Sequence, residues 1–187
     1  LRKIMKVADA YSMICMVFAS NFANAITDEA IKKLQPTWMI KTQNLENEKG
    51  NALLARALMH CKAEEIAADL DNFKVACSLK FFRQVSDEEI EHLYKQLNFD
   101  KPFTNLRATH VSNMFALLSA IFKNNTNEKT HTILGMYLVD FFLPSLVLFA
   151  KFLRYNAKTP YYQAMGEFIM DFIKTLKTNL GLKIDVK

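Results

Sequence analysis

Glycine, proline and cysteine are scarce in this sequence of 187 residues, which has four glycines, four prolines and three cysteines. Four glycines could hardly supply a glycine-rich phosphate loop, and no Walker, dinucleotide-binding or Gly-x-Ser-x-Gly motif occurs. Few helix breakers also predict long, uninterrupted secondary structure. The scarcity therefore argues against nucleotide-binding enzymes and serine hydrolases.

The cysteines are odd in number, and their spacing matches no metal site or disulfide framework. Each one lies within a stretch of helically spaced apolar residues. We therefore expect free thiols that pack as small hydrophobic groups in a reducing compartment, which predicts a cytoplasmic protein. The three residues are Cys15, Cys61 and Cys77.

The composition fits a folded protein, because 51% of the residues are hydrophobic and 23% are charged. The length predicts a single domain over residues 1–187. The net charge of +5 is concentrated after residue 93, but the lysines there are scattered and no arginine-and-aromatic platform accompanies them. We interpret them as a solvated helical surface and predict no nucleic-acid partner.

Apolar residues recur every three to four positions along nearly the whole chain, whereas alternating strand patterns are absent. The fold class predicted is an all-α, single-domain bundle of about eight helices. Several helices carry start signals: the capping box Ser86-x-x-Glu89, Thr27 before two acids, and Thr159 before Pro160, while Gly181 is a stop signal. The expected helices cover 3–23, 28–36, 46–60, 63–83, 87–97, 109–123, 129–156 and 160–180.

Residues 1–25 imitate a secretory signal peptide, with a basic start, an apolar run and an Ala-Asn-Ala ending. Helical spacing nevertheless continues through the basic start, and Asp9 interrupts a region that should be uncharged. We predict a core helix of the folded domain instead. The apolar positions on its expected buried face are Ile4, Val7, Ala8, Tyr11, Ile14, Cys15, Phe18 and Phe22.

The apolar stretch over 133–149 is at the lower limit of membrane-spanning length. Asp140 and Pro144 lie in its middle, and a charge at the bilayer centre costs about 3 kcal/mol on insertion scales. We predict a buried central helix kinked at Pro144, without stable membrane insertion.

Two Glu-x-x-His pairs, Glu89 with His92 and Glu128 with His131, raise the alternative of a di-iron carboxylate bundle. Such a site needs two further glutamates facing inward from other helices, and these are not evident. Glu128 also lies in a polar stretch near a helix start. We therefore predict no metal site, no cofactor and no catalytic activity.

The remaining carboxylates suggest a peptide-binding groove. An acidic run, Glu64, Glu65, Asp69 and Asp71, is typical of a solvated helix face. Asp140 and Glu167 are isolated among apolar residues, so each either points outward or lies near a cation, because burying an unpartnered carboxylate is costly. Together these acids could receive a basic and hydrophobic peptide.

Four segments resemble the TorD/DmsD/NarJ family of chaperones. They are FFLPSLVLFAKF at 141–152, AKTPYY at 157–162 with a closing apolar helix, ATHVSNMFALLS at 108–119, and NFKVAC at 72–77. His110 takes the place of the family's loop histidine, but Thr109 and Arg107 stand where aspartate and proline are usual. Leu148 replaces a tryptophan, and the family's histidine in that long helix is missing.

The resemblance implies a cytoplasmic chaperone that binds the twin-arginine leader or N-terminal region of an apo-molybdoenzyme and delays export until the cofactor is loaded. The acids Asp69 and Asp71 are expected to be exposed and to pair with a leader guanidinium. A generic helical interaction module stays an alternative, and monomer and homodimer are left open. The expected peptide-binding residues are Asp69, Asp71, Phe73, Arg107, Thr109, His110 and Asp140.

Overall fold

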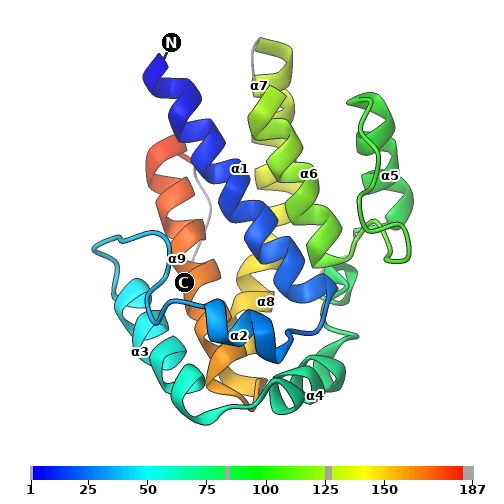
Figure 1. Cartoon of the computed structure of the whole chain (residues 1–187). Helices are drawn as coiled ribbons and strands as arrows, with labels where there is room; N and C mark the ends of the chain where they lie inside the picture. Colours follow the sequence, from blue (N-terminus) through cyan, green and yellow to red (C-terminus); the bar gives the residue numbers. More distant parts are fainter. Residues whose placement is uncertain (1, 83–84, 125–127, 183–187) are drawn as a thin grey trace. The chain divides into compact units, whose positions relative to one another are not determined.

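The computed structural model describes residues 2–82, 85–124 and 128–182, with side chains from residue 7 onward. The structure is 74% helical, and no strand occurs in the described ranges (Figure 1). The one short extended pairing there is an isolated antiparallel bridge between Ser78 and His110. The predicted all-α fold class is confirmed.

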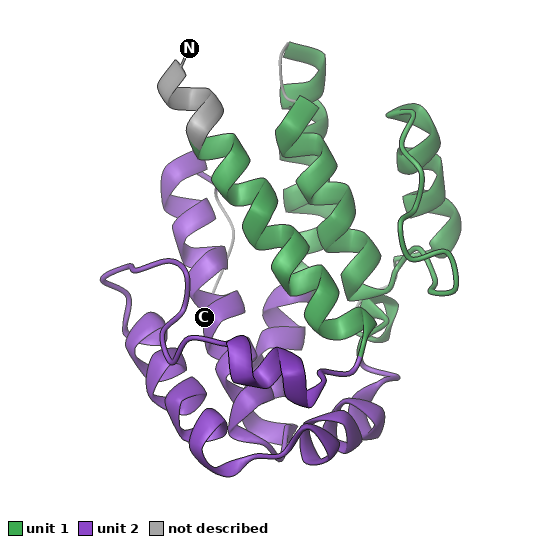
Figure 2. Cartoon of the chain, viewed as in Figure 1, with its two compact units in different colours: residues 1–24, 77–145 green, residues 25–76, 146–187 purple. Residues whose placement is uncertain are grey.

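The chain forms two compact units, each built from two separate stretches of sequence (Figure 2). Unit 1 combines residues 1–24 with 77–145, and unit 2 combines residues 25–76 with 146–187. The single domain predicted over 1–187 stays a prediction.

The described residues of unit 1 form four α-helices and two irregular helical turns. The turn η1 is a 3-10 helix, and η2 is a π-helical turn that leads into the next α-helix. The bounds are α1 (Arg2–Ala23), η1 (Leu79–Phe81), α5 (Asp87–Gln96), α6 (Val111–Asn124), α7 (Glu128–Met136) and η2 (Tyr137–Phe142).

Unit 2 contains α2, α3, α4 and α9, together with most of α8, whose first residues belong to unit 1. The bounds are α2 (Asp28–Lys33), α3 (Leu45–His60), α4 (Ala63–Phe73), α8 (Leu143–Asn156) and α9 (Pro160–Leu180).

The centre of unit 1 is the antiparallel pair α1 and α6 (Figure 1). Phe18 stacks on Phe115 with ring centroids 5.0 Å apart, and the hydroxyls of Ser12 and Ser119 are hydrogen-bonded at 2.7 Å. The core face predicted for α1 is confirmed at Tyr11, Ile14, Cys15, Phe18 and Phe22, which are all buried.

The prediction for α1 was wrong at Val7, which is 49% exposed. Ile4 is also part of that predicted face, but its side chain lies outside the described residues.

The centre of unit 2 is the antiparallel pair α3 and α9. Gly50 is what allows these helices to approach, because a Cβ at this position would lie 2.6 Å from Cδ1 of Phe168. On the other side of α9, Gly166 approaches the backbone oxygen of Ala150 on α8 in the same way. The helix α9 is therefore buried between α3 and α8.

The predicted helix starts are confirmed where the signal is local. Ser86 and Glu89 form the capping box of α5, and the Oγ1 atoms of Thr27 and Thr159 accept backbone N–H groups of α2 and α9. Gly181 follows α9 with a φ of 63°, the left-handed conformation that glycine adopts easily. These side chains satisfy backbone groups that the helix itself leaves unpaired.

The helix predicted over 63–83 was wrong beyond Phe73, where α4 ends. After that point the chain pairs with the segment before α6: Leu79 N–H donates to the carbonyl of Thr109 at 2.9 Å, and Val111 N–H donates to the carbonyl of Cys77 at 2.7 Å. This pairing uses the extended backbone of Ser78 (φ −81°, ψ 108°), which a continuous helix could not provide. Residue 83 lies outside the described residues.

The π turn η2 immediately precedes Pro144, and the kink predicted at this proline stays a prediction. Proline lacks an N–H group and its ring clashes with the carbonyl four residues earlier, here that of Asp140. Extra width in the preceding turn relieves that clash, so the helix continues as α8.

In the described part of the chain, one helical stretch, Glu128–Asn156, is long and apolar enough to cross a membrane, and 61% of its most apolar 18 residues are buried. That burial is compatible with a soluble protein.

Candidate functional site

The buried carboxylate of Asp69 holds the start of α9 against α4. Asp69 is 2% exposed, and its oxygens accept the backbone N–H of Lys158 at 3.0 Å and the backbone N–H and hydroxyl of Thr159 at 2.7 Å each. These donors compensate for the loss of water around a buried charge. The expectation that Asp69 is an exposed acid was therefore wrong, because its role is to fix the α9 start.

A depression of about 370 Å³ lies beside this contact in unit 2. It brings together two segments that carry the family resemblance, the end of α4 and the start of α9. Its lining residues are His60, Cys61, Glu65, Ala68, Asp69, Asn72, Lys158, Thr159 and Pro160.

One face of α4 supplies the polar wall of the depression. Glu65, Asp69 and Asn72 are spaced by four and three residues, which places them on the same side of the helix. Glu65 is the N3 residue of α4, and its Oε2 accepts the backbone N–H of Lys62 at 2.8 Å. Glu65 and Asn72 are exposed, so they are the acceptors available to a ligand.

Cys61 lines the depression as a neutral thiol. Burial raises the pKa of Cys61, and the negative charge of Glu65 raises it further. A thiol with a raised pKa is a poor nucleophile at neutral pH. The depression is therefore better suited to binding than to covalent chemistry.

Asp71 and Phe73 differ in exposure. Asp71 is exposed as predicted, and it pairs with Lys74 at 2.7 Å. Phe73 is buried, with its ring edge against Tyr162 at 4.9 Å and against Phe152 at 6.5 Å between centroids. Its ring is thus already covered within unit 2, which corrects the expectation that it offers an open apolar surface.

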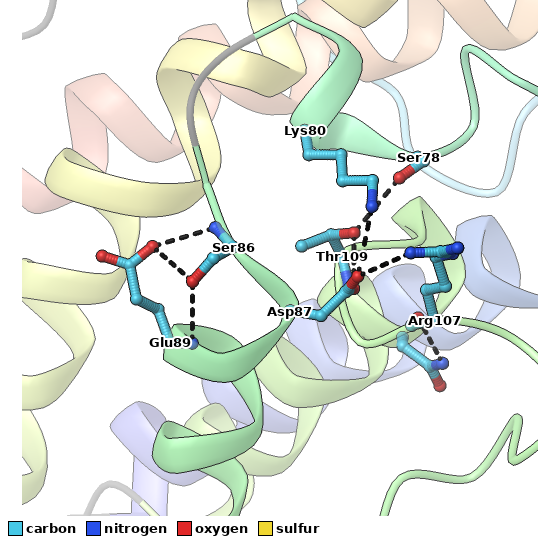
Figure 3. A network of polar contacts seen from close by, with 8 residues as sticks. Ser78, Lys80, Ser86, Asp87, Glu89, Arg107 and Thr109 are labelled. Atoms are coloured by element: carbon cyan, nitrogen blue, oxygen red, sulfur yellow. Dashed lines mark hydrogen bonds and ion pairs between the residues drawn. The ribbon is translucent and has the colours of Figure 1, made fainter.

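In unit 1, Asp87 is the centre of a polar network that includes two of the predicted residues (Figure 3). Its Oδ1 accepts the backbone N–H of Thr109 at 3.0 Å and the Thr109 hydroxyl at 2.8 Å. Its Oδ2 accepts hydrogen bonds from the guanidinium of Arg107 at 3.2 Å and the ammonium of Lys80 at 3.3 Å. Arg107 and Thr109 therefore anchor the loop before α6 to the start of α5.

The pKa of Asp87 reflects this network. Burial alone would raise it, but the hydrogen bonds from Thr109, then Arg107 and Lys80, outweigh burial and lower the pKa to about 2. Arg107 and Lys80 keep 66% and 40% of their side chains exposed and border a shallow depression of about 390 Å³. Because Asp87 already pairs with both cations, it is not available to a leader guanidinium.

His110 is half-buried immediately before α6, where its Nδ1 accepts the backbone N–H of Ser112 at 3.2 Å. Burial lowers the pKa of His110 to about 4, so the ring is neutral at pH 7. Its observed role is that of a helix-start residue.

The two isolated acids take the two alternatives expected for them. Asp140 is exposed on η2, whereas Glu167 is buried and pairs with Nε of Arg154 at 2.8 Å. Asp140 therefore points outward, and Glu167 has its cation within unit 2.

The predicted site residues are distributed over both units. Asp69, Asp71 and Phe73 belong to unit 2, whereas Arg107, Thr109, His110 and Asp140 belong to unit 1. Within unit 1 the structure brings Arg107 and Thr109 together, at Asp87.

Sequence reasoning missed three polar residues: Asp87, the buried Asp171, and Asn72, which is exposed in the wall of the depression. Asp171 is an isolated acid in an apolar helix, like Glu167, so the same signal could have found it. Asp87 had no local signal, because its partner Thr109 is 22 residues away.

Among the described residues, no group of three or more His, Cys, Asp or Glu side chains is placed to hold a metal ion. Glu89, from the first Glu-x-x-His pair, is used in the capping box of α5.

Comparison with protein-family models, with curated proteins and with solved structures finds no significant match to this chain.

Proposed function

We propose that this protein is a non-enzymatic, all-α chaperone for an exported redox enzyme. In this proposal it binds the twin-arginine leader, or the N-terminal region, of an apo-molybdoenzyme or related subunit in the cytoplasm. Binding would hold back export while the client's cofactor is loaded.

The observation that supports the proposal most is the depression between α4 and the start of α9. Two of the segments that resemble the chaperone family, 72–77 and 157–162, contribute to or adjoin its wall. Asp69 fixes α4 against the start of α9, because it accepts hydrogen bonds from the backbone N–H groups of Lys158 and Thr159. A rigid wall of this kind avoids the entropy cost of ordering the protein's own side chains and loops when a peptide binds.

The chemistry of the depression suits an arginine-containing peptide. Glu65 can accept two parallel hydrogen bonds from a guanidinium, and the side-chain oxygen of Asn72 can accept another. Ala68 and Pro160 add apolar surface between these groups and the α9 start. Because Asp69 is buried, we propose the exposed Glu65 as the residue that pairs with a leader arginine.

Calorimetry with a synthetic leader tests the proposal. The peptide carries two adjacent arginines followed by an apolar stretch. We expect replacement of both arginines by alanine to weaken binding about tenfold or more, since a hydrogen bond to a charged group contributes about 1.5–3 kcal/mol. Replacement by lysine should weaken it less than alanine does, because an ammonium keeps the charge but cannot form the parallel pair.

Two neighbouring glutamates provide a matched pair of protein variants. Glu65→Gln keeps a side chain that can still accept the Lys62 N–H, so α4 stays capped while the charge in the depression is lost. Glu64→Gln removes a charge from the same helical turn, but Glu64 is 78% exposed and outside the depression. We expect Glu65→Gln to weaken leader binding three- to tenfold and Glu64→Gln to leave it within about twofold.

Equal affinity for the arginine and alanine peptides would favour the generic interaction module instead. No binding of any leader by the folded protein would contradict the chaperone proposal.

A further inference from the structure

Residues 37–43, which we name the strap, lie within the connection between α2 and α3 and have no helical or strand structure (Figure 1). Alternate side chains along the strap differ in exposure. Trp38, Ile40 and Thr42 are half-buried, while the residues between them, Met39 and Lys41, are exposed. Every second side chain is thus the more buried one, as in a peptide bound to a receptor, while the backbone of the strap bends at residues 37, 39–40 and 43.

Side chains of α3 hold the backbone of the strap. The Oδ1 of Asn51 accepts the backbone N–H of Trp38 at 2.6 Å, and the Nδ2 of Asn47 donates to the carbonyl of Ile40 at 2.9 Å. Asn51 Nδ2 also donates to Asn47 Oδ1 at 3.1 Å, which fixes both amides in these orientations. Two asparagines one helical turn apart thus bind two backbone groups two residues apart.

Trp38 is the apolar anchor of the strap. Its indole stacks on the ring of Phe168 at a centroid distance of 4.4 Å and an interplanar angle of 11°. Phe168 is fully buried, and the missing side chain at Gly50 leaves room for its ring against α3. The indole therefore rests on a flat, rigid aromatic surface.

Asp171 is the polar anchor at the other end. It is 2% exposed, and its Oδ1 accepts the hydroxyl of Thr42 at 2.6 Å, four residues after the tryptophan. The same carboxylate accepts the side-chain amides of Asn44 at 2.7 Å and Asn47 at 2.8 Å. If the strap moved away and no other hydroxyl took the place of Thr42, the buried carboxylate of Asp171 would lose a hydrogen-bond donor.

We propose that the surface formed by Asn47, Gly50, Asn51, Phe168 and Asp171, named the α3–α9 face, is a peptide-binding site that the strap occupies as an internal ligand. The external ligand is a non-helical peptide of a partner protein, with a tryptophan and, four residues later, a threonine or serine. This inference goes beyond the leader site, because it uses other residues of unit 2 and requires no arginine in the ligand.

The strap competes with any external peptide. Because it is tied to the site at both ends, its effective concentration is on the order of millimolar, and a short peptide displaces it poorly. A partner with further contacts can displace it. Removal of the tryptophan anchor should therefore open the site to a peptide added from outside.

The test uses the strap's own sequence as the probe. The peptide PTWMIKTQN, which corresponds to residues 36–44, is capped at both ends and labelled with fluorescein, and binding is followed by anisotropy. The full-length Trp38→Ala protein should bind it at least tenfold more tightly than the wild-type protein does. Since Trp38 is the single tryptophan of the chain, an unlabelled peptide should also show a blue-shifted tryptophan emission when it binds this variant.

Two controls make the result specific. The same peptide with alanine in place of tryptophan should bind the Trp38→Ala protein at least tenfold more weakly. Thr42→Val, which keeps the indole but removes the hydroxyl bonded to Asp171, serves as a second opened variant if Trp38→Ala fails to fold. It should bind the probe more tightly than wild type, and its own Trp38 emission should shift to the red.

The proposal is overturned if the folded opened variant binds no peptide, if wild type and variant bind it equally, or if the tryptophan of the peptide makes no difference. Because the probe contains no arginine, none of these results depends on leader binding.

Discussion

Two aspartates on α4, only two residues apart, have opposite roles. Asp69 is buried and accepts three different donors from the start of α9, whereas Asp71 is exposed and contacts Lys74. The difference follows from the helical stripe of Ile66, Asp69 and Phe73, which are spaced by three and four residues and all buried. Position on this stripe, more than charge, decides what each acid does.

Asp69→Asn and Asp71→Asn therefore form a matched pair. We expect Asp69→Asn to lower the free energy of unfolding by about 2–3 kcal/mol, because it removes charge-assisted hydrogen bonds and turns an amide toward buried N–H donors. Asp71→Asn should change it by less than about 0.5 kcal/mol, as exposed ion pairs contribute little. Urea denaturation measures both, and equal losses would show that Asp69 does not hold the α9 start.

Asp87 should make stability depend on pH in the acid range. Its pKa is about 2 in the folded protein against an ordinary value of 3.8, so the folded state resists protonation more than the unfolded state. The contribution, about 2 kcal/mol, is present above pH 4 and is lost as the pH falls toward 2.

The measurement compares wild type with Asp87→Asn by urea denaturation at several pH values. The variant should be less stable by about 2 kcal/mol at pH 7, and the difference should shrink below pH 4. The pKa of His110 is lowered from 6.5 to about 4, so this residue also makes the protein less stable as the pH falls through that range. His110 is present in both proteins, and its effect therefore cancels in the difference between them. A difference that stays constant down to pH 3 would contradict the role given to Asp87.

At the level of elements, the sequence predicts helices and their starts well where the determinants are neighbours. Ser86 with Glu89, and Thr159 with Pro160, act within one helical turn, so their pattern is visible in the chain itself. The end of α4 depends instead on the pairing of residues 77–79 with 109–111, about thirty positions apart. The local sequence of 74–83 still has helical spacing, which explains why the prediction ran on to residue 83.

The candidate site was predictable only in part for the same reason. The acidic run on α4 and the segment 157–162 were both recognised, and they do meet at the depression. The burial of Asp69 and Phe73 depends on packing against residues of α8 and α9, such as Phe152 and Tyr162. Spacing showed that these residues share a helix face, but not that another helix covers it.

A substitution at Gly50 tests the close packing of α3 on α9, and the same substitution at Gly135 is the control. Gly50→Ala should destabilise the protein by about 1–3 kcal/mol, because the new methyl group overlaps the ring of Phe168, which is held between α3 and Trp38. Gly135→Ala on α7 meets no atom within 4 Å and should stabilise by about 0.5–1 kcal/mol through helix propensity. Thermal and urea denaturation compare the two, and a stabilising Gly50→Ala would contradict the packing described for the pair.

At the scale of the whole molecule, the chain passes repeatedly between two units, which are therefore not independent segments of sequence. Unit 1 holds the Asp87 network, which ties the loop before α6 to α5. Unit 2 holds both proposed peptide sites: the depression beside Asp69 and the α3–α9 face beneath the strap. Peptide binding by this protein should accordingly be a property of unit 2.

Protection of Cys61 is the most direct measurement of leader binding at the depression. Cys61 lines it and is partly exposed, whereas Cys15 and Cys77 are buried and provide internal controls. The protein is alkylated at mildly alkaline pH with and without saturating leader peptide, and modification of each cysteine is followed by mass spectrometry. We expect the twin-arginine leader to slow alkylation of Cys61 at least fivefold and the alanine peptide, at the same concentration, to slow it far less. An unchanged rate at Cys61 under conditions where calorimetry shows the leader bound would contradict the location of the site, and an unchanged rate without binding would contradict the proposed function.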